Sequence, residues 1–140
     1  MVKTSIRVTV IALGVAALAG LAHAQQSAAP KPATPTVTRT VLLQRDLPMA
    51  GYTEAMVAVE LPVGVREGRH MHSGTLIAYV REGAVTLDYE GKPTMTYKAG
   101  DTFTVDAGKV HEGMNKGTVT TKLIATFVYE KDKPMTTQVP

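Results

Sequence analysis

Apolar and polar residues alternate over several short stretches of the chain after residue 37, and this period of two is typical of half-buried β-strands. The clearest stretch covers residues 55–61, where Val57, Val59 and Leu61 share one face. The same pattern predicts further strands at residues 76–80, 84–89, 94–97, 102–105 and 120–129. No amphipathic helix is predicted beyond residue 37.

Glycine and proline separate these stretches and predict turns between them. One such segment, Tyr89-Glu90-Gly91-Lys92, predicts a tight hairpin between two adjacent strands. Many short strands joined by close turns are typical of an antiparallel sandwich or barrel. The predicted fold class is therefore all-β.

The beginning of the chain has a different character from the rest. Lys3 and Arg7 precede an uncharged apolar run over residues 8–21, and Ala22-His23-Ala24 then supplies the small residues of a cleavage site. A membrane anchor is the alternative, but the apolar run is short for a bilayer span. We therefore predict that residues 1–24 are a cleaved secretory signal, which gives the protein a periplasmic or secreted location.

Removal of this leader changes the composition that matters for function. Residues 25–37, rich in alanine and proline, are predicted to be a flexible linker, which leaves residues 38–140 for a single domain. The leader holds two of the 15 basic residues and none of the 12 acidic ones, so the mature chain is nearly neutral, at +1. This balance argues against binding to nucleic acid. The chain has no cysteine, so the domain depends on its aliphatic core without disulfides.

Three histidines remain after the leader is removed: His70, His72 and His111. Side chains two residues apart in a strand project from the same face, so His70 and His72 are able to reach one ion while Met71 points away. His111 follows the strand predicted at residues 102–105, near the turn after it, and a closed sheet would bring it opposite the pair. Imidazole nitrogens suit zinc, copper, iron and nickel. A His-x-His pair that binds nothing is also common in strands, and spacing alone leaves that alternative open.

The glycines around these histidines resemble the two signature motifs of the cupin superfamily. The first motif, G-x5-H-x-H-x3,4-E-x6-G, is matched by Gly64, His70, His72 and Gly83. The second, G-x5-P-x-G-x2-H-x3-N, is matched by Gly100, Gly108, His111 and Asn115. The resemblance covers about residues 41–130 and implies a double-stranded β-helix, a jelly-roll barrel. It also implies that the three histidines bind one divalent metal ion, with iron favoured over manganese, zinc, nickel or copper.

The chain departs from the two motifs at one position in each. Leu76 stands where the first motif has its ligand glutamate, and the alternative spacing falls on Ile77, which is also apolar. Asp106 replaces the proline of the second motif; it is a candidate ligand, although an aspartate that opens a turn is more often a turn residue. The other acidic candidates, each expected to be solvated surface and Glu112 to face away from His111, are Glu54, Glu67 and Glu112.

Two functions follow from these expectations. An all-histidine set resembles the iron sites of cupin-type thiol and diketone dioxygenases, which implies an exported, metal-dependent dioxygenase acting on a small organic substrate. The alternative is a non-catalytic cupin that binds a metal or a small ligand, because fold alone does not decide function. No catalytic residue beyond the ligands and no organic cofactor is predicted. The expected partner is a small molecule, without nucleic acid or stable membrane association once the leader is removed, and a homodimer is left open.

Overall fold

The structure is a computed structural model that describes residues 34–140. This part of the chain contains ten β-strands and no helix, which confirms the all-β prediction. No helix in this range is long and apolar enough to cross a membrane. The predicted leader, and all but the last four residues of the predicted linker, lie outside the described residues and stay predictions. The strands are β1 (Thr38–Asp46), β2 (Tyr52–Leu61), β3 (His70–His72), β4 (Thr75–Glu82), β5 (Ala84–Tyr89), β6 (Met95–Lys98), β7 (Thr102–Val105), β8 (His111–Met114), β9 (Thr121–Glu130) and β10 (Thr136–Gln138).

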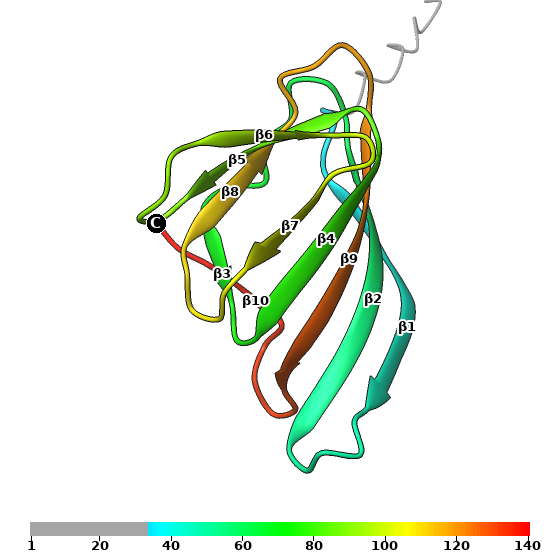
Figure 1. Ribbon diagram of the computed structural model, residues 1–140, viewed down its shortest axis with the longest axis vertical. Helices are drawn as coiled ribbons and strands as arrows, with labels where there is room; N and C mark the ends of the chain where they lie inside the picture. The colour runs from blue at the N-terminus through cyan, green and yellow to red at the C-terminus, as the bar shows by residue number, and fades with distance from the viewer. Residues whose placement is uncertain (1–33) are drawn as a thin grey trace, which may run out of the picture. The chain divides into compact units, whose positions relative to one another are not determined.

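The strands form two antiparallel five-stranded sheets (Figure 1). The larger sheet, which contains the longer strands, has the order β1-β2-β9-β4-β7. The smaller sheet has the order β10-β3-β8-β5-β6. Strands far apart in the sequence are neighbours within each sheet; β9, for example, lies between β2 and β4. The chain therefore crosses repeatedly from one sheet to the other, which is the double-stranded β-helix expected from the motif resemblance.

The hydrophobic core lies between the sheets, because alternate residues of the longer strands turn their side chains inward. In β2 the residues Val57, Val59 and Leu61 are buried while their neighbours are not. All ten residues of β9 follow the same alternation. The alternation seen in the sequence thus reports which face of each long strand is covered.

Most predicted strands are present with their expected bounds or within a few residues of them. Residues 84–89 and 102–105 form β5 and β7 as predicted. The predicted hairpin is also confirmed: Lys92 N donates a hydrogen bond to Tyr89 O over 3.0 Å, and Gly91 takes a φ of 78° that favours glycine. His111 lies just beyond the turn that follows β7, near the predicted place, and it begins a further strand, β8, that the sequence pattern did not predict.

Three strands were not predicted as such, namely β1, β8 and β10. Strand β1 is exposed along its whole length, so no buried face imposes an alternating pattern on it. Strands β8 and β10 have only four and three residues, which is too short for a period to be seen. These omissions matter because all three strands contribute to the site described below.

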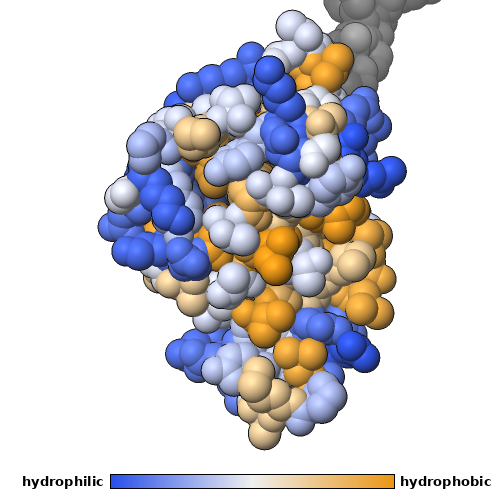
Figure 2. Space-filling model, in the orientation of Figure 1, coloured by the Kyte–Doolittle hydropathy of each residue, from blue (hydrophilic) through white to orange (hydrophobic). Residues whose placement is uncertain are grey.

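The outer face of the larger sheet and the edge strand β1 carry exposed apolar side chains. Figure 2 shows apolar residues gathered over this side of the molecule. The large apolar side chains concerned, each between 38% and 55% exposed, are Val41, Leu42, Leu43, Met56, Ile77 and Tyr79. This surface lies on the opposite face of the sheet from the core or on its open edge.

Asn115, the last residue of the second motif, serves the fold rather than the site. Its side chain is buried, and Nδ2 donates hydrogen bonds to the carbonyl oxygens of Leu61 and Val119, each over 2.8 Å. Its Oδ1 accepts a hydrogen bond from Gly117 N over 2.9 Å. Asn115 therefore fixes the loop that follows β8 against the end of β2.

Candidate metal centre

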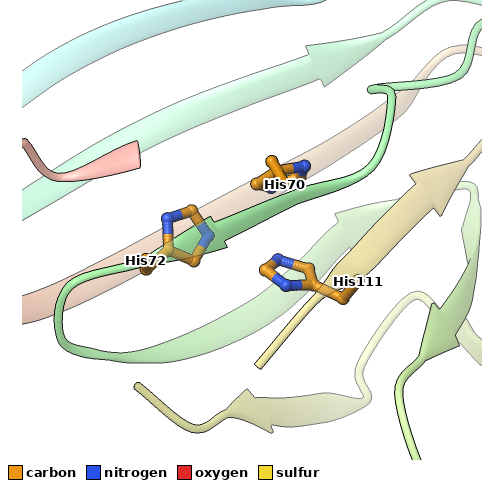
Figure 3. A group of neighbouring side chains, drawn as sticks. All are labelled: His70, His72 and His111. Carbon is orange, nitrogen blue, oxygen red and sulfur yellow. The ribbon is translucent and has the colours of Figure 1, made fainter. Parts of the chain in front are cut away.

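Two short strands of the smaller sheet bring the three histidines together. His70 and His72 are the first and last residues of β3, and His111 is the first residue of β8. Strands β3 and β8 pair with His70 directly opposite His111. Figure 3 shows the three imidazoles turned toward one another. All three are at most 4% exposed, and they offer ligand nitrogens that lie within 4.8 Å of one another.

Each imidazole is oriented by a hydrogen bond at its Nδ1 atom. The acceptors are backbone carbonyl oxygens: Gly68 O for His70 over 2.8 Å, Met135 O for His72 over 2.9 Å and Lys109 O for His111 over 3.0 Å. A carbonyl oxygen only accepts, so Nδ1 carries the proton in each ring. The lone pair of each neutral ring is then on Nε2, which is the arrangement that a metal-binding histidine requires.

Burial keeps the imidazoles uncharged. Desolvation, followed by repulsion from His111, lowers the pKa of His72 from 6.5 to about 3. Desolvation, with a smaller contribution from His70, also lowers the pKa of His111 from 6.5 to about 4. Both rings are therefore neutral at pH 7 with a free lone pair. His72 and His111 could therefore bind a metal ion without first losing protons.

The histidines line a small pocket whose opposite wall is apolar. The wall comes from the larger sheet, and the volume of the pocket is ≈ 40 Å³. The ring of Phe127 on β9 packs edge-on against His72, with 4.9 Å between ring centroids. Residues of the larger sheet in this wall are Val57, Val59, Leu76, Ala78, Phe103, Leu123, Ala125 and Phe127. Water is largely excluded from such a pocket, which strengthens electrostatic interactions inside it.

Leu76 lines this pocket, as expected from its position in the first motif. Its side chain is 6% exposed, whereas Ile77, the alternative motif position, is 55% exposed and faces outward. Among the described residues, no carboxylate joins the three histidines in the cluster. Because Leu76 stands at that position, the cluster consists of three imidazoles without the carboxylate that the motif would place beside them.

The expectation that Glu112 is solvated surface is wrong. Glu112 is 4% exposed, and its carboxylate accepts hydrogen bonds from Arg66 Nε over 2.9 Å and from Arg66 Nη2. The hydrogen bond from Arg66 is the main reason that the pKa of Glu112 lies below its ordinary value. Glu112 does not line the histidine pocket, so it is a buried ion-pair partner rather than a ligand.

The expectation of full solvation is wrong for Glu67 as well. The Glu67 side chain is only 12% exposed, lines the histidine pocket and forms an ion pair with Arg39 Nη2 over 2.6 Å. Arg39 belongs to β1, a strand that the sequence pattern did not predict, and it was not among the candidate residues. Nothing in the local sequence distinguishes Arg39 from a surface arginine, since β1 also carries Arg45, which does not line the pocket.

The remaining acidic candidates lie away from the histidines. The Glu54 side chain is 19% exposed and pairs with Arg45 Nε over 2.5 Å, so it is partly covered rather than solvated. Asp106 is exposed and accepts a hydrogen bond from the Tyr89 hydroxyl over 2.7 Å. Asp106 is thus a turn residue tied to β5, and the motif's missing proline is replaced by a hydrogen-bonded turn.

Solved structures with the same fold agree with this architecture. A conserved protein with a double-stranded β-helix domain from Klebsiella pneumoniae has a TM-score of 0.61 and 19% identity, over 79% of this chain and 90% of that chain. An oxalate oxidase has a TM-score of 0.61 and 21% identity, over 78% of this chain and 58% of the enzyme. The DMSP lyase DddQ from Ruegeria pomeroyi has a TM-score of 0.56 and 17% identity, over 61% of this chain and 43% of the lyase. Identities this low establish a shared fold and nothing about activity.

A search of curated proteins found no match to the chain. The match to a family model is direct: the model of the cupin domain covers residues 57–127, slightly more than half of the 140 residues. This stretch runs from within β2 to within β9 and contains His70, His72 and His111. Together with the two facing sheets, the match means that the protein belongs to the cupin domain family.

Proposed function

We propose that this cupin binds one divalent metal ion through Nε2 of His70, His72 and His111, and that the ion and the pocket beside it receive a small organic molecule. The observation that carries the proposal is the shared orientation of the three rings. Each Nδ1 is committed to a backbone carbonyl, and the three buried rings converge on one point. A histidine that serves only as core packing has no need of two others at the same point.

We further propose that the reaction is an oxygenation of the bound molecule by a metal-dependent dioxygenase, with iron as the favoured ion. A divalent ion held by three neutral imidazoles supplies Lewis acidity and electron transfer, and it leaves coordination positions for a substrate and O2. The protein contributes the ligand set, the apolar wall that excludes water, and the narrow space that restricts the substrate. Solved structures that share the fold include an oxidase and a lyase, so the fold is compatible with more than one reaction.

A non-catalytic binding module is the second candidate, and the composition of the pocket lining favours it. Apart from the histidines, the charged residues in the described lining are Arg39 and Glu67, which are bonded to each other. No lone acid or base therefore stands in the pocket ready to transfer a proton. Oxygen uptake with catechols, β-diketones and small thiols separates the two candidates.

Metal analysis of the purified protein and two variants tests the shared part of the proposal. We expect one equivalent of metal in the wild type and in Met71→Ala, because Met71 lies between the two histidines of β3 and does not line the pocket. We expect His111→Ala to lose stoichiometric metal. The loaded wild type should also melt at a higher temperature than the metal-free form, since an ion that binds only the folded state stabilises it. Full metal retention by His111→Ala would contradict the proposed ligand set.

We also propose export to the periplasm or the medium, with the mature protein beginning at Gln25. The support is the sequence of residues 1–24, which has the basic start, apolar run and small-residue site of a secretory signal. Intact mass spectrometry of the protein from its native compartment tests this directly. A mass that still includes residues 1–24 would reject it.

A further inference from the structure

An ion pair between residues from different parts of the chain forms part of the lining of the histidine pocket. Arg39 comes from β1, at the edge of the larger sheet, and Glu67 comes from the loop before β3. Both line the same pocket as the three histidines, and Arg39 is near enough to His72 to lower the pKa of that ring. Arg39 lies outside residues 57–127, the part of the chain that the family model matches.

The two partners are covered to different extents. The Glu67 side chain is 12% exposed, because its carboxylate lies against Gly113 of β8 and its backbone N donates to Gly113 O over 3.0 Å. The Arg39 side chain is 39% exposed and reaches Glu67 through Nη2 alone in the described part of the chain. A guanidinium has five N–H donors in a planar fork, so Arg39 keeps donors for a second acceptor.

The charges around the pocket are unbalanced once a metal ion is bound. Arg39 and Glu67 cancel each other, burial keeps His72 and His111 neutral at pH 7, and the lining residues other than these two and the histidines are uncharged. Leu76 contributes no carboxylate, so a divalent ion would leave the pocket with its full charge of +2. Because the wall is apolar and solvent is largely excluded, this charge is poorly screened and favours an anionic ligand.

We infer that Arg39 is the specificity-determining residue of the pocket and that the ligand is a small organic carboxylate. This inference rests on the proposed metal site and names the class of molecule it takes. One carboxylate oxygen binds the ion while the negative charge is recognised by the free donors of Arg39, in the charge-assisted geometry that guanidinium groups favour. Glu67 binds Arg39 when no ligand is present, and it competes with the ligand for the Arg39 guanidinium. The pocket volume of ≈ 40 Å³ restricts the ligand to a small molecule.

Malonate titrated into the Co2+-loaded protein tests the inference, with the visible spectrum of the bound cobalt and calorimetry as readouts. We expect Arg39→Gln to weaken malonate binding by about ten- to a hundredfold, as lost charge-assisted hydrogen bonds do. We expect Glu67→Gln to tighten it, because the competing carboxylate is removed. Neither substitution should change the cobalt stoichiometry, because neither residue is a ligand.

Arg45→Gln is the matched control. Arg45 is also a β1 arginine paired with a glutamate, Glu54, but it does not line the pocket. Its malonate affinity should match the wild type. The melting curves of Arg39→Gln and Arg45→Gln should stay close to that of the wild type, because the two arginine side chains are 39% and 63% exposed. If Arg39→Gln binds malonate as the wild type does, or Glu67→Gln binds it more weakly, the inference fails while the metal site stands. If cobalt does not bind at all, the proposed function fails, and the inference fails with it.

Discussion

Arg66 and Glu112 join the loop that precedes β3 to the strand that carries the third histidine. Arg66 donates to both carboxylate oxygens of Glu112, and the backbone of Gly68 lies near enough to that carboxylate to help lower its pKa. Gly68 in turn supplies the carbonyl that orients His70, while Glu112 is the direct neighbour of His111. One buried carboxylate thus ties together the backbone segments that position two of the three imidazoles.

Glu112→Gln should therefore lower the free energy of unfolding of the metal-free protein. The amide loses the charge of the carboxylate, so it no longer forms the paired charge-assisted bonds with Arg66, and we expect a loss of about 1–2 kcal/mol. The figure is modest because the Arg66 side chain is 64% exposed and can be solvated instead. Urea denaturation at pH 7 measures the loss. Glu82→Gln is the control, since the Glu82–Lys122 pair is exposed on both sides and its loss should cost less than about 0.5 kcal/mol.

The sequence predicted those parts of the fold and the site that depend only on residues close together in the chain. The long strands alternate because one face is buried, and β3 places His70 and His72 on one side for the same reason. Glycines of the motifs could be located because turns such as the one at Gly83 need a positive φ, here 73°. Leu76 could be placed in the pocket because the motif and the alternation agree on its direction.

The remaining features depend on pairings between distant segments, which no local pattern records. Met135 O orients His72 from a residue 63 positions away in the sequence, just before β10. Glu67 and Glu112 looked like surface residues because their arginine partners, 28 and 46 positions away, were not known. A glutamate in a glycine-rich loop has the same local sequence whether it is solvated or buried against an arginine.

The metal-free protein should lose stability as the pH falls below about 6.5. The pKa values of His72 and His111 are about 3 and about 4 in the folded protein, below the ordinary value of 6.5. Between pH 6.5 and about 4, the two histidines therefore take up protons in the unfolded chain but stay neutral in the folded chain. This difference lowers the free energy of unfolding by up to about 1.4 kcal/mol per pH unit for each histidine. Below the folded pKa values the loss should level off.

Denaturant titrations with EDTA between pH 7.5 and pH 5 measure this slope without contribution from most carboxylates. His111→Gln removes one of the two titrating groups and should make the slope clearly shallower. A slope that is flat in the wild type would mean that the folded protein accommodates protonated histidines, against the burial seen here.

Gly74→Ala should strongly lower the free energy of unfolding, although it adds only one methyl group. Gly74 lies between β3 and β4, and a Cβ added there would overlap the Val128 carbonyl oxygen of β9. Backbone atoms have no alternative rotamer, so the strands must separate, and we expect a loss of more than about 2 kcal/mol. Gly91→Ala is the comparison: its Cβ meets nothing within 4 Å, and only the φ of 78° is unfavourable, which costs about 1 kcal/mol. Thermal melting of both variants gives the order of the two losses. An equal loss would mean that the connection between β3 and β4 approaches β9 less closely.

Leu76→Glu should convert the three-histidine site into one with a charged fourth ligand. Leu76 is buried in the pocket wall and lies opposite Phe127 in the β4–β9 register. A carboxylate there would add a hard, negative oxygen donor to a neutral set, so we expect Mn2+ to bind about tenfold tighter or more. Without metal, the same carboxylate is buried among apolar side chains and loses its hydration, which should lower the stability of the metal-free protein by about 2–4 kcal/mol.

Ile77→Glu is the control for this substitution, because it adds the same charge one residue away on the 55%-exposed outer face of β4. It should leave both the Mn2+ affinity and the stability of the metal-free protein nearly unchanged, since long-range attraction across the sheet is screened by solvent. Mn2+ titrations followed by electron paramagnetic resonance, paired with melting curves in EDTA, separate the two effects. Equal Mn2+ affinities in wild type, Leu76→Glu and Ile77→Glu would show that a side chain at position 76 does not reach the ion. The opposite signs expected for Leu76→Glu, tighter metal binding with a less stable metal-free form, follow from a single cause: a buried carboxylate that is costly without the ion and is neutralised by it.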